Sequence, residues 1–146
     1  ALHFNADDIE VLHLPKGHTD GDSAVFFLKA NVAHLGDHFF MNAFPFVDLD
    51  SGGTVAGYIA NIEQLIARVD DATIIVPGHG GTTATKQDLY RYHAMLVETV
   101  ESVTSRSAQG QSAESIVAGG LDDKWSSWGS GFISEEMWIK TIVASL

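Results

Sequence analysis

The sequence predicts an α/β (α+β) domain in which a mixed β-sheet carries helices on one face. Short apolar segments that end at glycine or proline dominate the first half of the chain. Helical spacing of apolar residues dominates the second half, so strands come first and helices later. The 146 residues suit one domain, residues 1–146.

Four strands are expected at the start of the chain. Residues 2–14 alternate apolar and polar side chains around an Asn-Ala-Asp-Asp turn, which indicates a hairpin. Residues 23–29 are almost continuously apolar, and residues 32–40 form another strand that breaks at Gly36. Because both segments have so few polar residues, we expect these two strands to be buried on both faces or nearly so.

The remaining elements follow in order. Residues 41–53 contain proline, aspartates and a glycine pair and predict a loop, and residues 54–69 show the apolar spacing of an amphipathic helix. The string ATIIVPGHGG predicts a short strand that ends in a Pro-Gly turn. A long helix is expected from about Thr85, where Asp88 completes a capping box, to near Gly110. The last third predicts short helices, with Ser134 as an N-cap.

Composition excludes several classes of function. The formal charge of −11, without a Lys/Arg cluster, disfavours a nucleic-acid partner. No apolar run approaches the ~20 residues of a membrane-spanning helix, so no membrane partner is expected. The absence of Cys leaves His, Asp and Glu as the ligands for any metal and fits the periplasm and the cytoplasm equally well, so localisation stays open.

Three metal-capable residues stand where a strand breaks at glycine. His18 lies in Gly-His-Thr, Asp37 in Gly-Asp-His and His79 in Gly-His-Gly. Side chains at loop tips above a rigid sheet can converge on one point, and flanking glycines permit tight turns. Neutral imidazole and carboxylate are the ligands of a Zn²⁺ site without thiolate. The pattern therefore predicts a metal site at one edge of the sheet.

The strings GHTDGDSAVFF, HLGDHFF and IIVPGHG, in this order, resemble three motifs of the metallo-β-lactamase-fold hydrolase superfamily. The resemblance implies that His18 binds a first zinc ion, that Asp37 bridges two, and that His79 binds the second. A carboxylate suits the bridging position because it offers two separate oxygens to two cations. The implied small-molecule chemistry is hydrolysis, in which a zinc-activated hydroxide attacks a carbonyl-type substrate.

One superfamily signature, H-x-H-x-D-H, does not occur in the chain. The chain therefore resembles the C-terminal portion, half or most of an αββα metallo-β-lactamase sandwich, and alone it is expected to bind zinc partially or not at all. A half-sandwich leaves an apolar sheet face uncovered, which predicts association with an N-terminal half or with a second copy. The alternative function is a non-catalytic metal-binding or assembly module. A di-iron protein that reduces oxygen on the same fold would need a flavin partner.

Residues around the three motifs have expected supporting roles. Asp20 and Asp22 are candidates for supporting His18 through its second ring nitrogen, although Asp22 could equally hold the turn through the backbone. His38 is expected to support the site or line its wall. The aromatic residues that follow Asp37 would line an apolar substrate pocket or anchor the loop, and they are Phe40, Phe44 and Phe46. The substrate stays open among a β-lactam, a lactone and a thioester.

Overall fold

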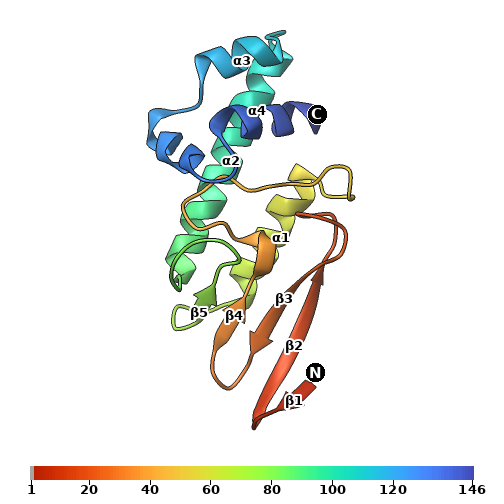
Figure 1. The fold of residues 1–146 in the computed structure, drawn as a ribbon, viewed down its shortest axis with the longest axis vertical. Helices are drawn as coiled ribbons and strands as arrows, with labels where there is room; N and C mark the ends of the chain where they lie inside the picture. The colour runs from red at the N-terminus through yellow and green to blue at the C-terminus, as the bar shows by residue number, and fades with distance from the viewer. Residues whose placement is uncertain (1) are drawn as a thin grey trace.

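The computed structural model describes residues 2–146 and contains a five-stranded sheet of order β1-β2-β3-β4-β5 (Figure 1). The first four strands pair antiparallel, and β5 pairs parallel with β4, so the predicted mixed sheet is confirmed. The strands are β1 (Leu2–Phe4), β2 (Asp7–Leu14), β3 (Asp22–Phe27), β4 (Val32–His34) and β5 (Ile74–Val76).

The helices follow the expected order, and their ends carry the expected caps. The Thr85 hydroxyl accepts from the Asp88 amide, and the Asp88 carboxylate accepts from the Thr85 amide, which completes the predicted capping box of α2. Ser134 caps α4. The elements are the 3₁₀ turn η1 (Gly36–His38), α1 (Val55–Arg68), α2 (Lys86–Ala108), α3 (Ala113–Gly119), the 3₁₀ segment η2 (Asp123–Ser130) and α4 (Glu135–Ala144).

Within residues 2–146 only one face of the sheet is fully buried, so the expectation that the two central strands are buried on both faces or nearly so is wrong. Leu14, Ala24, Phe26, Ala33 and Ile75 are buried on the face toward the helices. Their strand neighbours point the other way and remain partly or largely exposed. Residues 23–29 and 32–40 contain few polar residues because the uncovered face of the sheet is itself apolar.

We call this surface the open sheet face, and strand register defines it. One row runs across four strands as Ile9, Phe27, Val32 and Ile74, because each is the direct cross-strand partner of the next. A second row runs in the same way and consists of Val11, Val25, His34 and Val76. Seven of these eight side chains are apolar, which is unusual for a surface that faces water throughout.

The C-terminal helices lie at the opposite end of the molecule from the β1–β2 hairpin (Figure 1). They are joined to the long helix α2 by buried aromatic residues. The indole of Trp138 donates to the Thr99 hydroxyl at 2.9 Å, and Trp128 stacks on Tyr92. Within residues 2–146, no helix has the length and hydropathy needed to cross a membrane.

Candidate metal site

The three loops that follow strand ends meet at one edge of the sheet. The loop between β2 and β3 carries His18, the turn η1 after β4 carries Asp37, and the loop after β5 carries His79. Backbone pairing fixes two of these loops together, since the Met41 amide donates to the His79 carbonyl at 2.9 Å and the Gly78 amide donates to the Gly36 carbonyl at 3.0 Å.

Asp37 lies between the two histidines. Its Oδ1 is 2.8 Å from His79 Nε2, and its Oδ2 is 3.5 Å from His18 Nε2. Each carboxylate oxygen therefore faces a different imidazole. The structure brings the three predicted ligands together, with the carboxylate in the central position.

His18 is held in one tautomer by a backbone carbonyl. Its Nδ1 lies 2.7 Å from the carbonyl oxygen of Phe46. Because a carbonyl oxygen only accepts, Nδ1 carries the proton and Nε2 presents a lone pair toward Asp37. A metal-binding imidazole needs this arrangement. No local sequence signal predicts Phe46 as this partner, because the contact spans 28 positions of the chain.

The donors fit zinc only in part. Two ligand atoms of one tetrahedral zinc lie about 3.3 Å apart, given bonds of about 2.0–2.1 Å. The 3.5 Å separation of His18 and Asp37 suits that spacing, whereas the 2.8 Å contact of His79 is a direct hydrogen bond that must open by about half an ångström. Across residues 2–146, no three His, Asp or Glu side chains are grouped to hold a single ion. The set thus provides two incomplete half-sites of one imidazole and one carboxylate oxygen each.

His38 follows Asp37 in η1 and is fully buried. The Asn61 side-chain amide donates to His38 Nε2 at 3.0 Å, and the ring stacks on Tyr58. Burial, only partly offset by the carboxylate of Asp22, lowers the pKa of His38 to about 4. The ring is therefore neutral at neutral pH. Its contacts tie η1, the turn that carries Asp37, to α1, and its expected role at the site stays a prediction.

The two aspartates near His18 do not contact its ring nitrogens. Asp22 accepts from the backbone amide and the hydroxyl of Thr19, at 2.6 and 2.8 Å, and so holds the turn that carries His18. Asp20 is exposed, and its backbone carbonyl accepts from His13. The sequence left two roles open for Asp22, and these contacts agree with the second, in which Asp22 holds the turn.

Aromatic rings surround the two histidines. Phe40 stacks on His79 with ring centres 4.3 Å apart, and Phe46 meets His18 edge-on at 5.5 Å. These residues, together with Asp37 and Phe132, line a cavity of about 110 Å³ that we call the inner cavity. Phe132, which sequence reasoning missed, comes from the segment before α4. Phe44 lies elsewhere, since it is buried in the core and stacks on Trp138.

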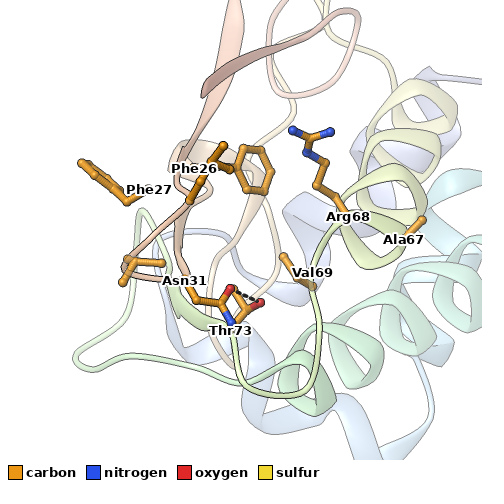
Figure 2. Close-up of a pocket in the computed structure, with 9 residues that line it drawn as sticks. Phe26, Phe27, Asn31, Ala67, Arg68, Val69 and Thr73 are labelled. Carbon is orange, nitrogen blue, oxygen red and sulfur yellow. Dashed lines mark hydrogen bonds between the residues drawn. The ribbon is translucent and has the colours of Figure 1, made fainter. Parts of the chain in front are cut away.

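A pocket of about 320 Å³ at the other end of β3 has satisfied polar groups (Figure 2). Arg68 pairs with Glu10 and lies over the ring of Phe26. The Thr73 hydroxyl donates to the Asn31 side chain at 2.9 Å. This pocket has no His, Asp or Glu among its lining residues, whereas the edge that carries Asp37 brings two imidazoles and a carboxylate together.

No protein-family model matches the sequence, and no curated protein sequence matches it. Solved structures do match. A metallo-β-lactamase from Pontibacter korlensis aligns with a TM-score of 0.55 and 19% identity, over 65% of this chain and 44% of that protein. The B3 metallo-β-lactamase BLEG-1 aligns with a TM-score of 0.53 and 26% identity, over the same shares.

A double mutant of the sec-alkyl sulfatase PisA1 aligns over 94% of this chain and 24% of that protein, with a TM-score of 0.74 and 11% identity. The chain thus spans less than half of the length of each of these three proteins. Its mixed sheet and helices correspond to part of their architecture. The described chain has the fold of one part of the metallo-β-lactamase αββα sandwich.

Proposed function

We propose that the chain is the C-terminal half of a zinc-dependent hydrolase of the metallo-β-lactamase fold that acts on a small molecule with a carbonyl-type reacting group. One observation carries the proposal: the two oxygens of Asp37 face two different imidazoles, those of His18 and His79. A carboxylate between two histidines is suited to bridge a pair of cations.

Each residue has a defined task in this proposal. His18 presents Nε2 because the Phe46 carbonyl holds the proton on Nδ1. Asp37 would supply one oxygen to each half-site and would accept a hydrogen bond from the attacking water, which would orient that water. His79 would exchange its hydrogen bond to Asp37 for a zinc ion in the second half-site. Zinc, when bound, lowers the pKa of water toward about 7 and acts as a Lewis acid on the substrate.

The missing ligands are proposed to come from an N-terminal half whose sheet packs on the open sheet face. The two apolar rows of that face, centred on Val25 and Phe27, support this partner. So does the 44% share of the aligned lactamases that the chain spans. A second copy of the chain is less suitable because it would repeat the same three ligands and add a further formal charge of −11.

The substrate classes favoured by the resemblance are β-lactams, lactones and thioesters. Sulfate esters form a second candidate class. In their favour, the sec-alkyl sulfatase aligns with 94% of the chain, a share that must include most of α3, η2 and α4. A non-catalytic metal-binding or assembly module remains the alternative, and it would bind zinc without turnover.

Zinc titration of the isolated chain tests the site. We expect weak uptake by the wild type, and the Asp37→Ala variant should lose affinity by at least about tenfold because both half-sites use this carboxylate. Asp71→Ala is the matched control, since Asp71 is exposed in the turn before β5. Equal zinc affinity in Asp37→Ala and wild type would contradict the proposed site.

Turnover separates the functional alternatives. Nitrocefin, a lactone, a thioester and an alkyl sulfate are offered to the isolated chain and to a longer polypeptide that includes the residues encoded ahead of Ala1. We expect two zinc ions and hydrolysis of one substrate class only in the longer polypeptide. Zinc binding without turnover of any of the four would favour the assembly module. Full activity of the isolated chain would refute the half-site account.

A further inference from the structure

Phe132 is held out of the core by a well-anchored segment. Its side chain is 78% exposed, the largest exposed fraction among the large apolar side chains of residues 2–146. On either side of it, Trp128 and Ile133 are buried, and Ser134 caps α4. The Phe44 amide also donates to the Trp128 carbonyl at 3.1 Å. The backbone around Phe132 is therefore fixed, and the exposure of the ring does not come from a loose loop.

The ring lies over the candidate metal site. Its centre is 6.1 Å from that of Phe46, with the two planes perpendicular, and Phe46 in turn meets His18 edge-on. This edge-to-face geometry is favourable for aromatic pairs. Phe132 and Phe46 thus form one apolar wall beside His18, and Phe40 forms another beside His79.

Phe132 also lines two adjoining cavities. The inner cavity, which contains Asp37, shares Phe40, His79 and Phe132 with a neighbouring hollow of about 310 Å³ that we call the outer cavity. The outer cavity has the size of a small-molecule pocket. A molecule whose reacting group lies at Asp37 therefore extends along the Phe132 ring. The other residues of the outer cavity are Met41, Asn42, Ala43, Gly80, Ser130 and Gly131.

The side chains that line the two cavities indicate which kind of ligand group they would bind. Neither cavity has a Lys or Arg among its lining residues, so neither offers a cation to a carboxylate or phosphate tail. The walls instead offer three phenyl rings, Met41 and Ala43. Apolar surface of this kind is stabilised when an apolar ligand removes it from water.

We propose that Phe132 and Phe46 form a binding site for a large apolar group of the substrate, an aryl ring or an alkyl chain of several carbons, attached next to the bond that is hydrolysed. This inference rests on the proposed function for the identity of the bond. The wall itself depends only on the phenyl rings, so its binding properties can be measured without turnover.

The test uses two carboxylate probes that differ only in a terminal phenyl group, 4-phenylbutyrate and butyrate. Dissociation constants are measured with the zinc-saturated chain from chemical-shift changes of the backbone amides of residues 130–133. We expect 4-phenylbutyrate to bind about tenfold more tightly than butyrate, because burying one phenyl group contributes at least that factor. In Phe132→Ala, the two constants should fall within about twofold of each other.

Phe4→Ala is the matched control, because Phe4 is a similarly exposed phenylalanine on β1. It should leave the ratio of the two constants unchanged. Equal binding of the two probes to the wild type, or a ratio that Phe132→Ala leaves unchanged, would overturn the inference. The latter result would leave Phe132 as a contact for another part of the protein.

The titrations are repeated without zinc, because the phenyl rings need no metal. The ratio of the two constants should persist even though both probes bind more weakly. A preserved ratio, together with absent zinc uptake or absent turnover in the longer polypeptide, would contradict the proposed function and leave this inference standing. Turnover of a substrate by the longer polypeptide, without any preference of the chain for the phenyl probe, would support the proposed function and contradict this inference.

Discussion

Replacing Tyr58 by phenylalanine should loosen the turn that carries Asp37. The Tyr58 hydroxyl donates to the Asp37 backbone carbonyl at 3.0 Å and lies 2.8 Å from the Tyr92 hydroxyl. Both tyrosines are fully buried, and burial raises the pKa of both hydroxyl groups, so both stay protonated. Tyr92 therefore donates to Tyr58, and Tyr58 donates to Asp37. This chain of hydrogen bonds links α2 through α1 to η1.

The expected loss of folding stability in Tyr58→Phe comes from two groups that lose a hydrogen-bond partner, the Tyr92 hydroxyl and the Asp37 carbonyl. The Tyr92 hydroxyl is left in a dry interior, which costs about 1–3 kcal/mol, and the lost bond to the Asp37 carbonyl adds about 1 kcal/mol. We expect the free energy of unfolding of Tyr58→Phe, measured by urea denaturation, to fall by about 2–4 kcal/mol. Zinc affinity should fall about tenfold because the carboxylate is less well positioned.

Tyr90→Phe provides the matched control. Tyr90 is on the same helix as Tyr92 but is 46% exposed, so removal of its hydroxyl should change the free energy of unfolding by less than about 0.5 kcal/mol. Unfolding of both variants at the same urea concentration would contradict the stabilising role of the Tyr92–Tyr58–Asp37 hydrogen bonds. Their role in positioning the carboxylate fails if Tyr58→Phe loses stability but binds zinc as tightly as the wild type.

Two further predictions concern the loops around the sheet. In Gly78→Ala, the added Cβ would lie 2.3 Å from the Gly36 carbonyl oxygen, so we expect a loss of about 1–3 kcal/mol in urea denaturation. Gly81→Ala, where a Cβ meets nothing within 4 Å, should behave as wild type, and similar losses in both would contradict this account. Hydrogen bonds from the Asn31 side chain and the Ala72 backbone amide hold the pKa of Asp70 below its ordinary value of 3.8, so its folded-state pKa lies below its unfolded-state pKa. Asp70 therefore contributes stability above about pH 4 that is lost as the pH falls through its folded-state pKa. The stability difference between wild type and Asp70→Asn should be largest above about pH 4 and shrink below it, and parallel pH profiles would refute the role.

Local sequence signals predicted most of the fold. The helix expected at residues 54–69 is α1, Val55–Arg68, because apolar spacing and the Thr54 cap act within a few residues. The helix expected from Thr85 is α2, which ends at Ala108, close to the predicted stop at Gly110. Burial of the central strands could not be predicted in this way. An apolar run looks the same whether its second face meets a helix or remains open.

Some features of the candidate site could also be predicted from local sequence, and others could not. The meeting of His18, Asp37 and His79 could be anticipated, because each follows a strand end at the same edge of the sheet. The carbonyl that orients His18 and the Phe132 ring could not, since both come from distant segments with no local signal. A lone phenylalanine between glycine and isoleucine predicts neither exposure nor a place above a metal site.

The proposed metal ligands and the proposed apolar wall come from different parts of the molecule. The polar donors come from short loops at the sheet edge, where backbone pairing between the His79 and Asp37 loops fixes their geometry. The apolar wall comes in part from the segment before α4, which depends on the packing of Trp128 and Ile133 instead. Because the Phe132 segment is held by core contacts of its own, the Phe132 ring can be removed without moving the imidazoles, whereas Phe46 also orients His18 through its backbone carbonyl. Phe132→Ala can therefore test the apolar wall separately, since the variant removes one ring of the wall and leaves the arrangement of His18, Asp37 and His79 in place.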